Sequence, residues 1–359
     1  MNFKKLPLII ALSGLFVSPA IFAQEAAKPV EEFKPSGKVD ARIYADHYTT
    51  TSQPETGALS LLPKNGFELK RAYFGYGYQF APVWSARVML DITNDKVLTD
   101  RNVYFKHAYA QYSKGPLKAT FGIQDTYNFM LNDKIYGKRY LHLPFYDQFK
   151  YYTSADLGAS VEYTLGNYTI DLSIYNGEGF RQVQSDNAYR TGLGITGKFI
   201  DKKLTARVMA DYLNKEYQQS SLSAFLSYQV ANKFTLGGEI DFQYHPDYNV
   251  YKDNVNTTPT NFLMARDKNH YGVSLFGMYY FAKNWNVFTR YDYVTSTSLT
   301  DENSYAKRSI LLAGNQVISG VEYVYSKNLR FAADYQTFNP ELGGVKEISK
   351  VFLHAEVAF

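Results

Sequence analysis

The chain has 359 residues, with 38 basic and 34 acidic side chains, no cysteine, and an aromatic fraction of 17% that includes 33 tyrosines. The lack of cysteine excludes a disulfide-stapled fold and any thiolate site, and the aromatic content excludes an intrinsically disordered chain. Tyrosine at this density suits a wall that meets lipid, water and the interface between them.

The first residues have the pattern of a secretory signal. Two lysines precede an apolar stretch over 6–17, and we expect processing after Ala23. Removing residues 1–23 removes two lysines and no acid, which leaves a formal charge of +2 and no reason to expect a nucleic-acid partner. Residues 24–36 are polar and contain two prolines, and they are predicted to form a short periplasmic tail.

From residue 37 to residue 359 one pattern repeats: a run of alternating apolar and polar residues, a tight turn, another run, and a longer polar loop. Alternation with period two marks a strand whose two faces meet different surroundings. Sixteen such runs are predicted, near 37–48, 67–80, 84–94, 102–113, 117–125, 155–166, 168–177, 188–199, 203–213, 220–230, 233–245, 270–281, 284–295, 310–326, 328–338 and 347–359. Short and long connections alternate, as in a transmembrane barrel with tight periplasmic turns and long outer loops.

Aromatic side chains gather beside the short connections, on the apolar face, as Tyr78, Trp84, Phe281 and Trp285 illustrate. Such a ring at one height is the interfacial girdle of a membrane barrel, whereas a secreted β-sandwich would bury its large aromatics in mid-strand. The predicted fold class is therefore all-β. We expect a 16-stranded antiparallel transmembrane β-barrel over 37–359, in the outer membrane of a diderm bacterium.

The connection over 126–154 is the longest, and a loop of this length in an ordered barrel usually has a function. We expect it to fold inward as a constriction loop, and the alternative is an exposed surface loop. Its candidate pore-facing charges are Lys134, Lys138, Arg139 and Lys150.

Charged residues also stand at strand positions predicted to line the pore. The bases are Arg42, Arg71, Arg87, Lys118, Arg207, Arg290 and Arg330, and the main acids are Asp91, Asp211, Glu239, Asp241, Asp292 and Asp334. On three strands an arginine precedes an aspartate by four residues, and the two side chains are too far apart to pair within the strand. This spacing predicts a belt of basic residues toward the periplasm and a belt of acidic residues above it. The alternative is that these charges pair with neighbours on adjacent strands and only brace the wall.

Six segments carry a resemblance to a known family: Phe67–Ala72 (FELKRA), Lys106–Tyr112 (KHAYAQY), Phe121–Tyr127 (FGIQDTY), Ser154–Gly158 (SADLG), Tyr175–Phe180 (YNGEGF) and the final Phe359. In order and spacing they resemble the phosphate-selective porin O and P family and its Bacteroidetes relatives, most closely over 37–180. The resemblance implies a usually trimeric diffusion channel, with Phe359 read by the outer-membrane assembly machinery. Phosphate-selective members line the pore with many Arg and Lys, whereas the mixed charges here predict at most a weak anion preference.

The sequence indicates no catalytic residue, metal or cofactor. Its six histidines, at 47, 107, 142, 245, 270 and 354, lack paired metal spacing and are interpreted as wall or loop residues. The expected partners are outer-membrane lipids, the assembly machinery, small ions or solutes, and further copies of the chain. Two alternatives stay open: an oligosaccharide or hydrocarbon channel, suggested by inward Tyr44, Tyr73, Phe225 and Phe288, and a barrel enzyme whose Ser, His and acid lie on separate strands.

Overall fold

The structure is a computed structural model that describes residues 32–55, 60, 63–94, 100–214, 218–244, 249–252, 262–265, 269–297, 313–341 and 346–359. The predicted signal peptide, and residues 24–31 of the predicted tail, lie outside the described residues. The chain divides into two units, Met1–Lys34 and Pro35–Phe359, and the helices and strands of the described residues all lie in the second unit.

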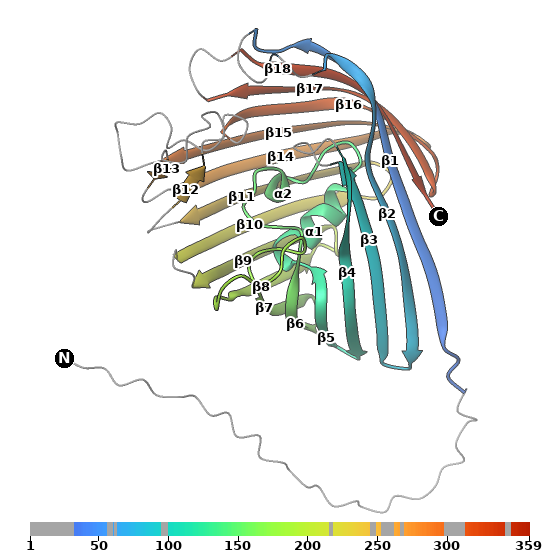
Figure 1. Cartoon of the computed structure of the whole chain (residues 1–359). Helices are drawn as coiled ribbons and strands as arrows, with labels where there is room; N and C mark the ends of the chain where they lie inside the picture. Colours follow the sequence, from blue (N-terminus) through green and yellow to red (C-terminus); the bar gives the residue numbers. More distant parts are fainter. Residues whose placement is uncertain are drawn as a thin grey trace, which may run out of the picture. The chain divides into compact units, whose positions relative to one another are not determined.

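Sixteen strands form a closed antiparallel barrel, in which β1 pairs with β18 from Arg42 opposite Ala358 to Ser52 opposite Ser349. The prediction of a 16-stranded antiparallel barrel is confirmed. Figure 1 shows the strands following one another around the ring in chain order. They are β1 (Ser36–Ser52), β2 (Asn65–Ala81), β3 (Trp84–Asn94), β4 (Arg101–Lys114), β5 (Leu117–Asp125), β6 (Ala155–Leu165), β7 (Tyr168–Tyr175), β8 (Arg190–Phe199), β9 (Leu204–Asn214), β10 (Gln218–Val230), β11 (Phe234–Tyr244), β14 (Asn269–Ala282), β15 (Trp285–Thr297), β16 (Gly314–Ser326), β17 (Leu329–Pro340) and β18 (Ile348–Ala358).

The alternation of the sequence places apolar side chains outside and polar side chains inside. Along β10, Leu222 and Leu226 are exposed on the outer surface, while Ser221 and Ser223 are buried. This reverses the arrangement of a water-soluble protein, and it is the arrangement that a closed barrel needs in hydrocarbon. Within the described ranges, the structure contains no helix long and apolar enough to cross a membrane.

Eight connections between barrel strands leave only two to four residues, and seven of them lie at one end of the barrel, which we call the turn end. Gly115 and Gly166 adopt left-handed φ angles of 56° and 58° in two of these turns, where a residue without Cβ is favoured. The opposite end, the loop end, carries most of the longer connections. Strict alternation is nevertheless wrong at one place, because β9 and β10 extend until only residues 215–217 remain between them. A two-stranded sheet, β12 (Asn249–Lys252) with β13 (Phe262–Ala265), lies in the chain between β11 and β14.

The connection between β5 and β6, residues 126–154, lies inside the barrel, and we call it the insert. It contains α1 (Tyr127–Tyr136) and the short α2 (Phe145–Gln148), which Figure 1 shows within the ring of strands. Helix α1 ends at Gly137, whose φ of 62° supplies a left-handed C-cap. Two buried apolar clusters join the insert to the wall: one centres on Tyr136, Tyr140 and Leu141 of the insert, the other on Phe145, Tyr146 and Phe149.

Candidate functional site: the lumen and its insert

Two β-bulges turn consecutive basic residues toward the lumen. The register of the β1–β2 ladder skips Lys70, and that of the β3–β4 ladder skips Lys106. A bulge sets two residues against one, so neighbours in sequence can share a face. Both members of each pair accordingly meet inward carboxylates. Lys70 Nζ lies 3.3 Å from Asp46 Oδ2, Arg71 Nε lies 3.3 Å from Asp91 Oδ1, and Asp125 Oδ1 lies 3.6 Å from Lys106 Nζ and 3.0 Å from His107 Nε2.

The insert is attached to strands on opposite sides of the lumen. Near its start the Asn128 side chain donates to Asp211 of β9 at 2.5 Å, and near its middle Lys138 pairs with Glu322 of β16. Further bonds reach β2, β4, β11, β15 and β17: Lys70 to the Tyr140 carbonyl, Lys106 to Ser154, Asn132 to Glu239, Gln243 to the Tyr151 carbonyl, Arg290 to the Leu143 carbonyl, and Arg330 to the Gly137 carbonyl. The insert therefore crosses the lumen and does not follow one side of the wall.

A narrow zone, which we call the waist, lies where the insert meets β1 and β2. The rings of Tyr44 and Tyr73 make an edge-on contact at 5.8 Å, and Tyr44 lies 6.4 Å from the ring of Tyr140. Arg139 Nε donates to the Tyr73 hydroxyl at 3.3 Å. The three tyrosines are buried, so wall and insert are in contact here.

Arg139 holds two acids of the insert, which respond differently to burial. Its guanidinium lies 2.8 Å from Asp147 and 3.7 Å from Asp133. Burial raises the pKa of Asp133 in spite of Arg139, whereas the Arg139, Lys150 and Lys106 charges outweigh burial and keep the pKa of Asp147 below its usual range. Burial also lowers the pKa of Lys138, although Glu322 opposes this shift.

At the turn end the inward bases are half-exposed, and each has an acid at its own level. Arg87 lies 2.5 Å from Asp40, Lys118 lies 2.8 Å from Glu162, Arg330 lies 2.7 Å from Glu356, and Arg42 lies 4.0 Å from Asp40. Deeper in the wall, Arg207 makes two bonds to Asp171 at 2.6 and 2.9 Å, and Arg290 pairs with Asp292 on its own strand at 2.6 Å. The predicted separate basic and acidic belts are therefore wrong, because each of these arginines has an acid at its own height, from another strand or from two residues away on its own strand.

Two of these ion pairs cross an intervening strand at a glycine. Arg207 of β9 reaches Asp171 of β7 over β8, where a Cβ on Gly194 would overlap both side chains. Arg87 of β3 reaches Asp40 of β1 over β2, where Gly75 is the partner of Asp40 in the ladder. The missing Cβ of Gly194 leaves room for the Arg207 side chain to lie flat on the wall, whereas a Cβ on Gly75 would meet Val88 and Met89 of β3.

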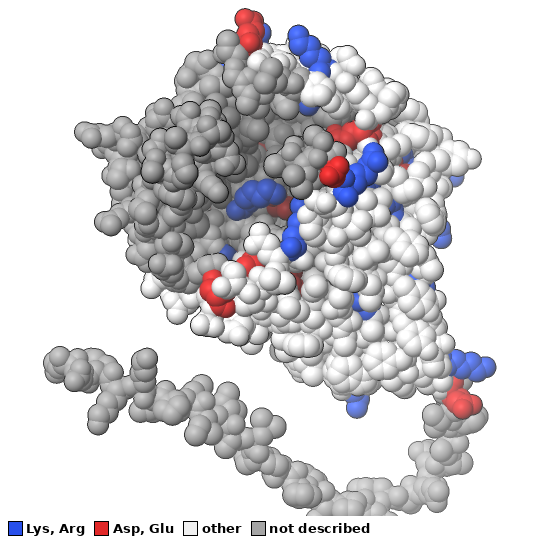
Figure 2. Space-filling model, viewed as in Figure 1, with Lys and Arg blue, Asp and Glu red and all other residues white. Residues whose placement is uncertain are grey.

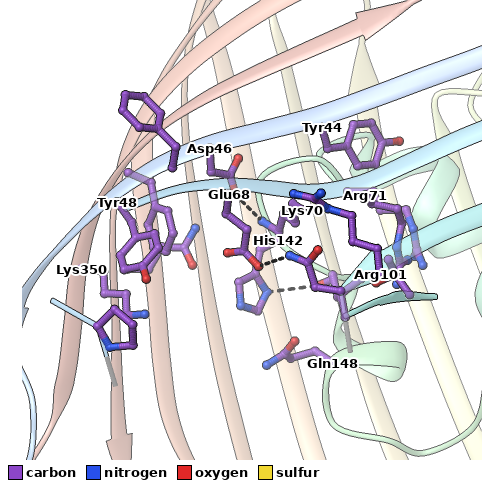
Figure 3. Close-up of a pocket in the computed structure, with 18 of the residues that line it drawn as sticks. Tyr44, Asp46, Tyr48, Glu68, Lys70, Arg71, Arg101, His142, Gln148 and Lys350 are labelled. Carbon is purple, nitrogen blue, oxygen red and sulfur yellow. Dashed lines mark hydrogen bonds and ion pairs between the residues drawn. The ribbon is translucent and has the colours of Figure 1, made fainter. Parts of the chain in front are cut away.

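A cavity of about 950 Å³ opens between the insert and the wall formed by β17, β18 and β1 to β4. We call it the vestibule, and Figure 2 shows the molecule hollowed on one face, with charged side chains in the hollow. In Figure 3, Tyr48 and Lys350 lie on one side of the cavity and Arg101 on the other, and a dashed line joins Lys70 to Asp46. Five basic residues, Lys70, Arg71, Arg101, Arg139 and Lys350, and three acidic residues, Asp46, Glu68 and Asp100, line it.

The remaining predicted site residues differ in their surroundings. Lys134 and Lys150 of the insert are exposed. The acids predicted to line the pore at the level of the insert, Asp91, Asp211, Glu239, Asp241, Asp292 and Asp334, are all buried on the inner side of the wall. Phe359 is 65% exposed, and its backbone bonds to Ala41 of β1. Across the described residues, no group of three or more His, Asp or Glu side chains could hold a metal ion.

Lys70, Lys106 and His107 were not predicted from the sequence as inward charges, and His354 was expected only as a wall or loop residue. The available signal for the first three was two consecutive basic residues inside an alternating strand, which is incompatible with a regular ladder and indicates a bulge. For His354 the alternation of its strand indicated the inner face, but no signal indicated its pairing with Asp46, which lies 308 residues away on β1.

Solved structures of similar fold are outer-membrane proteins. The outer membrane channel DcaP of Acinetobacter baumannii superposes with a TM-score of 0.63 at 12% identity, over 90% of this chain and 97% of that chain. The anion-selective porin from Comamonas acidovorans gives 0.62 at 10% identity, over 91% and 100%. The trimer form of OmpT, an outer membrane protein of Vibrio cholerae, gives 0.58 at 11% identity, over 90% and 99%.

Neither a protein-family model nor a curated protein matches this sequence. The specific resemblance to the phosphate-selective porin O and P family therefore stays a prediction. At identities of 10 to 12%, the structural comparisons bear on the fold alone. The chain has the fold of an outer-membrane porin.

Proposed function

We propose that this protein is a porin of the outer membrane of a diderm bacterium, which lets small hydrophilic solutes and ions diffuse passively through a water-filled lumen. The vestibule carries this proposal, because a barrel that was only a membrane anchor would not need a charged cavity of about 950 Å³ inside its wall. The apolar outer surface and the fold shared with an outer membrane channel and an anion-selective porin support it.

In this proposal the solute path enters the vestibule at the loop end and passes the waist along the side formed by β17, β18 and β1 to β4. It then reaches the turn end between half-exposed side chains such as Arg42 and Arg87. The insert narrows this path at the waist and is anchored on the far side of the lumen by its contacts with β9, β11, β15 and β16. We therefore assign the insert the role of constriction that the sequence predicted.

We further propose a weak preference for anions. Five basic and three acidic residues line the vestibule. Arg71 pairs with Asp91, and Arg139 pairs with Asp133 and Asp147, but none of these three acids is among the residues that line the cavity. Because most inward bases are paired and salt screens charges over about 8–10 Å, the preference stays far from strict phosphate selectivity.

Planar-bilayer recording tests the channel function. The purified protein should give stepwise increases in conductance. In a KCl gradient, the sign of its reversal potential should indicate weak anion selectivity. Absence of conductance from correctly folded barrels would refute the proposal, and clear cation selectivity would refute its anion part. Saturable block by an oligosaccharide would instead favour a dedicated sugar channel.

Shortening the insert tests its role as constriction. Deletion of residues 132–148 removes Lys138 to Leu141, the part that meets β1, β2 and β16, and should raise single-channel conductance severalfold. The matched control deletes 181–186 from the connection between β7 and β8, and should leave conductance near that of the wild type. Equal conductance of the insert deletion and the wild type would contradict a constricting role.

Two further predictions belong to the same proposal. We propose that the protein is a homotrimer in outer-membrane lipid, in line with the trimer form of OmpT from Vibrio cholerae. Native electrophoresis with chemical cross-linking would test this oligomeric state.

We also propose that exposed Phe359 is recognised by the assembly machinery before β18 pairs with β1. Phe359→Ala should then lower the amount of barrel in the membrane without changing the conductance of the channels that do assemble.

A further inference from the structure

A histidine bridges two acids where the barrel closes on itself. His354 of β18 points its Nδ1 at Asp46 of β1, 2.6 Å away, and its Nε2 at Asp334 of β17, 3.1 Å away. The three side chains are at most 1% exposed. An ionised carboxylate only accepts hydrogen bonds, so both ring nitrogens must donate, and the geometry calls for the doubly protonated imidazolium.

Each of the two acids also contacts a side chain that holds the insert. Lys70 of β2 pairs with Asp46 at 3.3 Å and donates to the backbone carbonyl of Tyr140 at 3.3 Å. The Gln336 amide of β17 donates to Asp334 at 3.2 Å and to the Leu141 carbonyl at 3.4 Å. The insert segment at 140–141 is thus bound to the wall by groups that His354 orders.

Two aromatic rings, one from the insert and one from β18, pack against the His354 imidazole. The Tyr140 ring meets the imidazole edge-on, with centroids 6.2 Å apart at 85°, and Phe352 stacks on it at 5.2 Å and 13°. The charged and titratable groups facing His354 are therefore Asp46 from β1, Asp334 from β17, and Tyr140 and His142 from the insert, with Lys70 from β2 behind Asp46. The next inward acid of β18, Glu356, is held by Arg330 at 2.7 Å.

The charge balance of this group depends on one proton. With His354 protonated, two cations face two carboxylates, and the group is neutral. Loss of the proton leaves one excess negative charge out of water, and it sets a ring nitrogen lone pair against a carboxylate oxygen. A buried ion-pair group that loses one partner is strongly destabilised, and the contacts that share its carboxylates weaken with it.

We propose that protonated His354 locks the insert to the barrel seam, and that its deprotonation releases the segment at 140–141 and widens the waist. This inference rests on the proposed function, since it concerns the regulation of that channel. The lock makes the closure of β1 with β18 and the position of the constriction depend on the same proton.

The absence of cysteine allows a direct test with a single thiol. Leu141 is fully buried under the lock, so Leu141→Cys in the otherwise natural chain reports its release through the rate of modification by a charged methanethiosulfonate. Lys134→Cys, exposed on α1, gives the reference rate and corrects for the pH dependence of the thiol itself. The quantity measured is the ratio of the two rates in vesicles, between about pH 6.5 and about pH 9.5, a range chosen to include histidine titration and to end below the ordinary pKa of lysine, about 10.4.

With natural His354 the ratio should be low at the acidic end and rise about tenfold or more toward the alkaline end, as expected for loss of a buried ion-pair partner. In His354→Gln, a neutral mimic, it should be high and flat throughout. His354→Arg, a permanent cation with several donors, should keep it low throughout. The matched control is His107→Gln, because His107 pairs with Asp125 on the wall, and this variant should keep the natural profile.

A flat, low ratio with natural His354 across this pH range would overturn the proposal, and so would an assembled His354→Gln barrel with the natural profile. If His354→Gln does not assemble, the titration of the natural chain decides alone. The thiol rates report on the insert whether or not the barrel conducts. Barrels that conduct no ions therefore refute the proposed function, whereas an unchanged thiol ratio in conducting barrels refutes only the lock.

Discussion

Inward charges occur in two regions of the lumen, and the structure uses them differently. At the turn end, the Arg42 side chain is 49% exposed and that of Arg87 is 25% exposed. At the level of the insert, Arg290 and Asp292 are at most 2% exposed, and Arg290 also bonds to the insert. The same residue types at the same strand positions line water in one region and anchor the insert in the other. Cover by the insert, and not strand position, therefore decides the role of an inward charge.

The largest effect should come from breaking an anchor at the level of the insert. Lys138→Met leaves buried Glu322 with only the more distant Arg330 guanidinium, 3.9 Å away, and should destabilise the protein by about 3–5 kcal/mol. Urea unfolding in lipid vesicles measures this, and the double variant Lys138→Met/Glu322→Leu should recover most of the loss. Lys134→Met, on the exposed face of α1, is the control and should stay within about 0.5 kcal/mol of the natural protein. Equal losses of stability in Lys138→Met and Lys134→Met would contradict the anchoring role of the buried charges at the level of the insert.

A slightly smaller effect is expected at the glycine beneath a crossing ion pair. A methyl group on Gly194 would overlap Arg207 and Asp171, so Gly194→Ala should destabilise by about 2–3 kcal/mol through displacement of that pair. The control is Gly77→Ala on β2, where nothing lies within 4 Å of an added Cβ. Unfolding midpoints of the two alanine variants test the prediction, and a Gly194→Ala barrel as stable as Gly77→Ala would contradict it.

Acid should loosen the insert by up to about 1–2 kcal/mol. Burial, together with the Arg290 and Lys70 charges, holds the pKa of His142 well below its usual value near 6.5. Protonation of His142 therefore favours the undocked insert, so the His142 contribution to docking is fully present above about pH 6.5 and is lost as the pH falls below it, by at most about 1.4 kcal/mol per pH unit. Conductance should increase between about pH 6.5 and about pH 5, before most carboxylates protonate. The increase should be absent in His142→Gln, and a rise of the same size in that variant would assign it to another group.

The smallest effect belongs to the half-exposed bases of the turn end. Arg42→Gln with Arg87→Gln should reduce anion selectivity in reversal-potential measurements and change stability by only about 0–1 kcal/mol, because exposed ion pairs contribute little. A large loss of stability would show that these charges also brace the wall. An unchanged reversal potential would show that Arg42 and Arg87 do not lie on the path of the conducted ions.

The sequence was sufficient for the barrel but not for its interior. Sixteen strands were predictable because each outer face must be apolar, and that requirement repeats locally along the chain. The ion pairs were not predictable, because Arg207 meets Asp171 across a strand and His354 meets Asp46 from the other end of the chain. The helix over Tyr127–Tyr136 was missed because the wall around it, and not a strong amphipathic pattern of its own, determines which of its side chains are buried.

The bulges at Lys70 and Lys106 also suggest how such a lumen can change during evolution. In a regular strand only every second side chain points into the lumen. A shift of the strand by one residue would turn the charged side chains toward the lipid. One inserted residue adds a cation inside and leaves the outward residues before and after it in place, at the cost of a local ladder irregularity. A single-codon insertion or deletion at these sites is therefore a route by which the charge of the channel can drift while its lipid-facing surface stays the same.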